Sequence, residues 1–337
     1  MYEVSTCTEF IQKKTAQGLS IVNNQSLNLR TCVTSVSNTI FQVTMPRIVQ
    51  NIWQWGYKAS RGGRILKSRH MSKAVYSLYR YLLTARGRTP LVNGFRMHLP
   101  DDCFYTYALS DYEPSVTKAV LSLIRSEDIV IDIGANVGYY TLLAARQVGN
   151  VEEVYAFEAD PDNFNILTEN IALNSFANVT PVRKAVSNRT GKTKFYIKDS
   201  MSHSLCDHTV LPTRASITVD TVALDDFICN CPTEVRKRIS LIKMDIEGAE
   251  PLALEGMAEF LRSKKKLTMI SELVPSFYTS NTLSDYIDQL RSFDFAISVI
   301  QETGAVPLQD ERLQDVDRVR GVNLLCSKPS SSLITCI

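Results

Sequence analysis

The stretch "IVIDIGANVGYYTLLAA", residues 129–145, decides the fold class of this 337-residue chain. Its first residues are almost all apolar, which is typical of a central strand in a parallel sheet that is covered on both faces. A turn with two glycines follows, and the apolar residues beyond it predict a helix. In an open α/β sheet, ligands bind beyond the carboxyl ends of the strands, near the point where the strand order reverses. We therefore expect Asp132, Gly134, Asn136 and Gly138 to edge a ligand site.

Strands and helices are predicted to alternate on both sides of this stretch. We expect further strands at 153–159, 179–187, 240–246 and 267–273, and helices at 115–126, 140–147, 161–174, 251–266 and 283–293. This alternation indicates right-handed βαβ units and a mainly parallel sheet. The segments 296–300 and 321–327 can pair as a final hairpin, and residues 89–102 read as a short hairpin that enters the domain.

Charge divides the chain into a basic part and an acidic part. Between Glu9 and Asp101 there are fourteen Lys and Arg residues and no acidic residue, although the whole chain has a net charge of only +2. We predict a weakly ordered polar segment at 1–45, a basic helical extension at 46–95 and the main domain at 96–330. The basic, Trp-containing extension, over residues 46–90, could contact a membrane surface or another anionic partner, or could pack on its own domain.

Composition places the chain among ordinary globular proteins. The hydrophobic fraction is 45% and the charged fraction is 21%. No apolar run reaches the roughly 18 residues that a membrane-spanning helix needs. The eight cysteines include no Cys-x-x-Cys pair and do not form a zinc pattern. We expect free thiols and a cytoplasmic protein.

Three ligands are candidates for the glycine turn. A nucleoside triphosphate would need Gly-Lys-Ser/Thr, but Tyr139 and Tyr140 follow the second glycine. A dinucleotide prefers Gly-x-Gly-x-x-Gly, and Ala135 stands at the middle position, which weakens an NAD-binding oxidoreductase as an alternative. S-adenosylmethionine has no phosphate and carries an ammonium and a sulfonium. Asp132 at the end of the strand could meet that ammonium directly or through water.

The next predicted strand ends at Glu158, 20 residues after Gly138. A carboxylate at this place can accept hydrogen bonds from both ribose hydroxyls, which favours an adenosine-containing ligand. Asp160 and Pro161 are typical of an N-cap and a first helical residue. Glu158 is therefore predicted to bind the ligand, while Asp160 caps the following helix.

Three carboxylates, those of Asp245, Glu247 and Glu250, follow the predicted strand at 240–246. Carboxylates grouped at the ligand edge of a sheet are unfavourable unless something cationic or protic meets them. They could act on the acceptor of a transferred group, cap a helix, or hold a divalent metal. We predict no metal, because no histidine joins the group.

The segments "DIVIDIGANVGYYTLLAA" (128–145), "VYAFEADPDNF" (154–164) and "LIKMDIEGAE" (241–250) together resemble the FkbM family of class I S-adenosylmethionine-dependent methyltransferases. Two further segments, "DYEPSVTKAVLSLIRSED" (111–128) and "MISEL" (269–273), extend the resemblance over roughly residues 105–300. It implies a Rossmann-like α/β fold with a seven-stranded, mostly parallel sheet, a reversed last strand and helices on both faces. It also implies O-methylation of a sugar or another small hydroxylated metabolite, and we include a glycolipid among the expected acceptors.

The resemblance assigns roles to individual residues. It implies that Asp132, Gly134, Asn136 and Gly138 form the turn for S-adenosylmethionine, that Glu158 holds the ribose, and that Ala185 lies near the adenine. Asp245 would sit closest to the transferred methyl. It also implies that Glu113 and Glu272 support the acidic cluster.

An alcohol acceptor must lose a proton during methyl transfer, and a positioned base contributes about 10²- to 10⁴-fold. Asp245 and His203, the latter in the polar loop "DSMSHSL" (199–205), are the candidates for this base. Two alternatives remain: a nucleic-acid methyltransferase that grips phosphates with its basic third, and a catalytically inactive S-adenosylmethionine-binding protein. The first is disfavoured because the strand at 240–246 lacks an Asn/Asp-Pro-Pro-Tyr element.

Overall fold

The computed structural model describes residues 81, 89–108, 112–149, 153–198, 201–207, 213–278, 280–309 and 321–328. The chain divides into two units, Met1–Ala59 and Ser60–Ile337, and all described residues belong to the second. The polar segment 1–45 and most of the basic extension lie outside these residues, so their order, helices and membrane contact stay predictions. Among the described helices, none combines the length and the apolar character needed to cross a bilayer.

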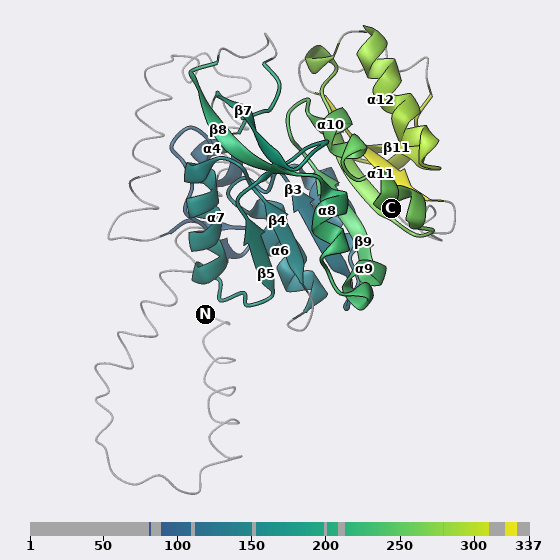
Figure 1. Ribbon diagram of the computed structural model, residues 1–337. Coiled ribbons are helices and arrows are strands. Elements are labelled where there is room, and N and C mark those ends of the chain that lie inside the picture. Colours follow the sequence, from purple (N-terminus) through teal and green to yellow (C-terminus); the bar gives the residue numbers. More distant parts are fainter. Residues whose placement is uncertain are drawn as a thin grey trace, which may run out of the picture. The chain divides into compact units, whose positions relative to one another are not determined.

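One large sheet organises the described part of the chain (Figure 1). Its strands are β3 (Ile129–Ile133), β4 (Val154–Phe157), β5 (Val179–Val182), β9 (Ile239–Met244), β10 (Thr268–Leu273), β11 (Ala296–Gln301), β12 (Gly304–Pro307) and β13 (Val322–Ser327). They follow the order β12-β11-β13-β10-β9-β3-β4-β5. The strands from β10 to β5 run parallel, whereas β13 is antiparallel to both of its neighbours. The predicted mostly parallel sheet with a reversed last strand is confirmed, and β12 adds an eighth strand at the edge.

Helices cover both faces of this sheet. They are α4 (Phe104–Ala108), α5 (Pro114–Leu123), α6 (Tyr139–Val148), α7 (Pro161–Leu173), α8 (Leu224–Cys229), α9 (Thr233–Arg238), α10 (Glu250–Glu255), α11 (Ala258–Ser263) and α12 (Ser280–Ser292), with a 3₁₀ turn at Pro275–Phe277. Residues of α5, α6 and α7 share a core with Val130 of β3, whereas residues of α8, α10, α11 and α12 share another core with Ile131. Because alternate side chains of β3 enter opposite cores, the strand is apolar nearly throughout.

Two smaller sheets flank the large one. The predicted entry hairpin is confirmed as β1 (Leu91–Val92) and β2 (Phe95–Arg96), joined by Asn93 and Gly94, whose positive φ values suit a tight hairpin turn. The other sheet has three strands, β6 (Ala185–Val186), β7 (Gly191–Ile197) and β8 (Ala215–Val222), in the order β6-β8-β7. The predicted single strand at 179–187 is therefore divided between β5 and β6, which belong to different sheets.

The predicted helix at 251–266 is wrong as one continuous helix, because it is divided into α10 and α11. A Cβ added to Gly256 would lie 1.9 Å from the carbonyl oxygen of Ser187, so the backbone packs tightly where the helix stops. The Asp225 carboxylate accepts hydrogen bonds from the backbone N–H groups of Glu259 and Phe260 and thereby caps the start of α11.

The described residues include five cysteines, and all of them are free thiols: Cys103, Cys206, Cys229, Cys231 and Cys326.

Candidate functional site

The strand order reverses between β3 and β9, so the site is expected beyond their carboxyl ends. A cavity of about 520 Å³ opens there. Its walls come from the turn after β3, the end of β4, the region around β6, the loop segment 201–207 and the turn after β9. The sequence-predicted residues that line the cavity are Gly134, Asn136, Glu158, Ala185, His203, Asp245, Glu247 and Glu272.

The glycine turn brings the ends of β3 and β9 into direct backbone contact. Gly134 has a φ of +81°, and a Cβ at this residue would lie 1.9 Å from the carbonyl oxygen of Asp245. The amide of Asp245 in turn donates to the carbonyl of Ile133 at 3.0 Å. Glycine is required at 134 because a side chain would push the two turns apart and move Asp245 out of place. Gly138, at φ +97°, begins α6 and does not line the cavity.

Asp132, which was expected to edge the ligand site, lies in β3 next to the carboxyl end of the strand. Its side chain is buried, it does not line the cavity, and it accepts a hydrogen bond from Thr141 Oγ1 at 2.5 Å. Burial raises the pKa of Asp132 to about 6, although the Thr141 hydrogen bond opposes that shift. The Asp132 side chain ties β3 to α6, and its contact with a ligand ammonium, directly or through water, stays a prediction.

Glu158 joins the turn to the end of β4. Its Oε2 accepts from the backbone N–H of Asn136 and its Oε1 from that of Asp160, both at 2.8 Å. The residue is 6% exposed, lines the cavity, and has a pKa raised to about 7, chiefly by burial. Each carboxylate oxygen has a further lone pair, so Glu158 can still accept hydrogen bonds from a ligand's hydroxyls.

Asp160 begins α7 as predicted: its Oδ1 accepts from the backbone N–H groups of Asp162 and Asn163. Its Oδ2 lies 3.4 Å from Nδ1 of His203. The His203 side chain is 11% exposed, lines the cavity and meets the Phe195 ring edge-on, with the ring centres 6.1 Å apart. His203 therefore stands on the wall beside Asp160 and Glu158.

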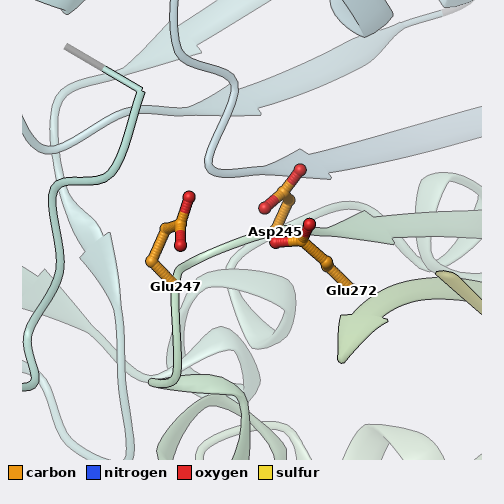
Figure 2. Close-up of side chains that lie close together, drawn as sticks. All are labelled: Asp245, Glu247 and Glu272. Carbon is orange, nitrogen blue, oxygen red and sulfur yellow. The ribbon is translucent and has the colours of Figure 1, made fainter. Parts of the chain in front are cut away.

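An acidic cluster, which comprises Asp245, Glu247 and Glu272, occupies another part of the wall (Figure 2). Oxygens from the three carboxylates all lie within 4.8 Å of one another. Burial and the charges of Asp245 and Glu247 raise the pKa of Glu272 well above its usual range. Glu272 ends up beside Asp245 because β10 pairs with β9 in parallel, so both carboxylates reach the same edge of the sheet.

A buried lysine compensates this cluster, and sequence analysis missed it. Lys243 lies near the carboxyl end of β9 and is 2% exposed. Its Nζ is 3.1 Å from Oδ2 of Asp245 and 5.1 Å from the centre of the Tyr140 ring. Burial by itself would lower the pKa of Lys243, but the charges of Asp245, Glu113 and Glu272 raise it above its usual value. Three carboxylates could hold a divalent cation, but this ammonium already supplies a positive charge. The absence of a metal stays our prediction.

Glu250 was expected in the acidic group, and the structure corrects this. It is 1% exposed, does not line the cavity, and accepts hydrogen bonds from the backbone N–H of Ile246 at 3.1 Å and from the Tyr278 hydroxyl at 2.6 Å. Burial raises its pKa. Glu250 thus fixes the turn after β9 from inside, and Glu272 takes its place in the cluster.

Glu113 supports the site from behind. It precedes α5 in a left-handed conformation and accepts hydrogen bonds from the Tyr140 hydroxyl at 2.6 Å and from Asn323 Nδ2 at 3.2 Å. It does not line the cavity. Its role in this arrangement is to orient Tyr140, whose ring covers Lys243.

Four tyrosines that were not predicted as site residues also line the cavity: Tyr107, Tyr112, Tyr139 and Tyr140. Their ring centres are 4.5 to 6.1 Å apart in a chain of contacts. Tyr139 and Tyr140 directly follow the glycine turn in the sequence. This position could have identified them as site residues, because an aromatic residue there faces the same cavity as the turn. Large aromatic faces next to hydrogen-bond acceptors suit a ligand with both apolar C–H surfaces and hydroxyls.

A family profile matches half of the chain. The family profile described as "Methyltransferase FkbM domain" matches residues 132–302. The chain is 30% identical over 151 residues to the hexuronic acid methyltransferase AglP of Haloferax volcanii, across 45% of this chain and 59% of AglP. It is 24% identical over 149 residues to Methyltransferase 1 of Beauveria bassiana, across 39% of this chain and 59% of that protein. In both cases the match spans less than two thirds of the relative's length.

Among solved structures, the chain is similar to Methyltransferase FkbM from Methylobacillus flagellatus KT. The identity is 17%, the match covers 86% of this chain and 60% of the other, and the TM-score is 0.39. The profile match, in contrast, spans about half of this chain and includes the glycine turn, Glu158 and the acidic cluster. The chain belongs to the FkbM methyltransferase family.

Proposed function

We propose that this protein is an S-adenosylmethionine-dependent O-methyltransferase that methylates a hydroxyl of a saccharide or another small hydroxylated acceptor. One observation carries the proposal. A single cavity at the switch point has Glu158 on one wall and the acidic cluster of Asp245, Glu247 and Glu272 on another. The first wall suits a ribose, and the second suits a hydroxyl that must lose its proton.

The residues around the glycine turn fit S-adenosylmethionine better than a phosphate-bearing ligand. Gly134 allows the backbone to approach closely, and Glu158 offers acceptor lone pairs for two vicinal hydroxyls. The turn carries no lysine for a phosphate. A positively charged sulfonium is also compatible with the carboxylates nearby.

When bound, S-adenosylmethionine supplies a methyl group on a positively charged sulfur that an oxygen can attack in line. The protein aligns the acceptor oxygen with that methyl, and alignment of this kind contributes several kcal/mol, on the order of 7 in favourable cases. With S-adenosylmethionine bound, Asp245 would accept the proton of the attacking hydroxyl as the O–CH₃ bond replaces the S–CH₃ bond, and S-adenosylhomocysteine would be the second product. Lys243 keeps the Asp245 carboxylate oriented from behind.

One relative supports a saccharide acceptor. AglP is named for its action on a hexuronic acid, and the tyrosines of this cavity offer flat faces against which a sugar ring can pack. The carboxylates can accept hydrogen bonds from its hydroxyls. We extend the proposal to a hexose-type ring on these grounds.

Mass spectrometry of acceptor mixtures tests the proposed function. The protein is incubated with methyl-labelled S-adenosylmethionine and with methyl glycosides of hexoses, hexosamines and hexuronic acids. We expect label to appear on a hydroxyl of at least one glycoside, in step with release of S-adenosylhomocysteine. Methylation of added RNA with no methylated glycoside would contradict the proposal and favour a nucleic-acid methyltransferase.

A further inference from the structure

His203 has two possible roles, and its surroundings distinguish them. A base must reach the acceptor hydroxyl, whereas a cofactor-binding residue must lie near Glu158. The His203 imidazole lies against Asp160, whose backbone N–H donates to Glu158. Glu158 and His203 both line the cavity, so the ring and the Glu158 carboxylate can reach the same ligand.

The loop segment 201–207, which carries His203, is attached to the molecule on two sides. Ser204 exchanges backbone hydrogen bonds with Tyr196 of β7, at 2.8 and 3.2 Å. Its hydroxyl donates to the carbonyl of Glu247 at 2.7 Å. Cys206 Sγ lies 3.4 Å from the carbonyl oxygen of Gly248. The segment thus extends from the three-stranded sheet to the turn after β9 and forms a wall of the cavity.

An apolar cluster adjoins this wall. It consists of Ala159, Ala185, Phe195 and Val219, with Leu205 of the loop segment packed against it. Ala159, Ala185, Phe195 and Leu205 line the cavity. An adenine ring needs flat apolar contacts on its faces and a few polar contacts at its edge. Glu158, this apolar cluster and His203 together provide both kinds of contact.

We propose that His203 is a cofactor-binding residue that contacts the adenosine part of S-adenosylmethionine, and that the loop segment 201–207 closes this subsite. The inference rests on the proposed function. Nδ1 of His203 faces the Asp160 carboxylate at 3.4 Å, although no hydrogen bond joins them, and Nε2 is the nitrogen that we assign to the ligand. This nitrogen can accept a hydrogen bond from a ribose hydroxyl or from the adenine amino group.

Calorimetric titration of S-adenosylhomocysteine and of adenosine tests the inference without any acceptor. We expect His203→Ala to weaken both ligands by the same factor, on the order of 5- to 10-fold, the amount that one hydrogen bond contributes. Glutamine can place an amide near the Nε2 position, whereas asparagine reaches only the Nδ1 position. His203→Gln should therefore keep most of the affinity, and His203→Asn should lose it.

His98→Ala is the matched control, because it makes the same substitution at an exposed histidine that does not line the cavity. It should bind both ligands as the wild type does. Thermal unfolding of each variant without ligand shows that the variants are folded. Equal affinities for wild type and His203→Ala would overturn the inference and leave the proposed function standing. Failure of the wild type to bind S-adenosylhomocysteine would overturn both.

Discussion

Nζ of Lys243 lies 3.1 Å from Oδ2 of Asp245, and the two residues occupy different surroundings: the lysine is buried inside β9, while the aspartate side chain is 25% exposed at the cavity. A charged lysine inside a parallel strand is unfavourable unless it is paired. Its pairing with Asp245 explains how three carboxylates can share one small volume. The buried ammonium therefore supports the site although Lys243 does not line the cavity.

Replacement of Lys243 by methionine should destabilise the protein. The apolar side chain fills a similar volume but leaves the acidic cluster without its nearest positive charge, so we expect the free energy of unfolding to fall by about 2 kcal/mol. Urea denaturation measures this change. The double variant Lys243→Met/Asp245→Asn should recover part of the loss, because it also removes the uncompensated carboxylate. Strictly additive losses would mean that the two residues do not interact.

Asp245→Asn tests the proposed base. The amide keeps the size of the side chain and cannot accept the hydroxyl proton, so turnover of the glycoside found by the acceptor screen should fall by about 10²-fold or more. The affinity for S-adenosylmethionine should stay within a few-fold of the wild type, because Glu158 is unchanged. Initial rates and calorimetry on the same preparation give both values. Wild-type turnover in the variant would assign proton removal to another group.

Gly134→Ala tests the close approach of the two turns. The added Cβ would meet the Asp245 carbonyl oxygen at 1.9 Å, and the residue would also have to adopt a φ of +81°. Gly149→Ala is the control, because Gly149 has a φ of +90° but nothing lies within 4 Å of its added Cβ. The control should lose about 1 kcal/mol from backbone strain, and Gly134→Ala about 3 kcal/mol more. Thermal unfolding measures both changes. If the two variants lose the same free energy of unfolding, the close approach of residue 134 to Asp245 does not exclude a side chain.

The raised pKa of Glu158 predicts a specific pH dependence of stability. Burial raises this pKa from 4.5 to about 7, so between these values the folded protein binds more protons than the unfolded chain. The free energy of unfolding must then fall as the pH rises through this window. Between about pH 5 and about pH 8, the wild type should lose up to about 3 kcal/mol relative to Glu158→Gln, whose side chain does not titrate. If the free energy of unfolding changes with pH in the same way in both proteins, the raised pKa of Glu158 is contradicted.

The sequence predicted the sheet and the position of its ligand edge well, for a physical reason. A strand such as 129–133 is apolar on both faces only when helices cover both, and this pattern is visible without coordinates. Asp160 and Pro161 were likewise recognised as a helix start, because capping depends on neighbouring residues.

Contacts between distant segments were harder to predict. Glu250 was grouped with Asp245 because it is close in sequence, but the helical turn directs it to Tyr278, 28 residues away. Lys243 was overlooked because a single lysine in an apolar strand has no sequence pattern of its own. The division of the helix at 251–266 depended on Asp225, a capping residue from another element.

The central claim is that this cavity binds S-adenosylmethionine through Glu158, and calorimetric titration tests it most directly. S-adenosylmethionine and, separately, NAD are titrated into the wild type and into Glu158→Ala. We predict micromolar binding of S-adenosylmethionine to the wild type, a loss of at least about tenfold in the variant, and no comparable binding of NAD. Binding of NAD in place of S-adenosylmethionine, or equal affinity of S-adenosylmethionine for both proteins, would contradict the account.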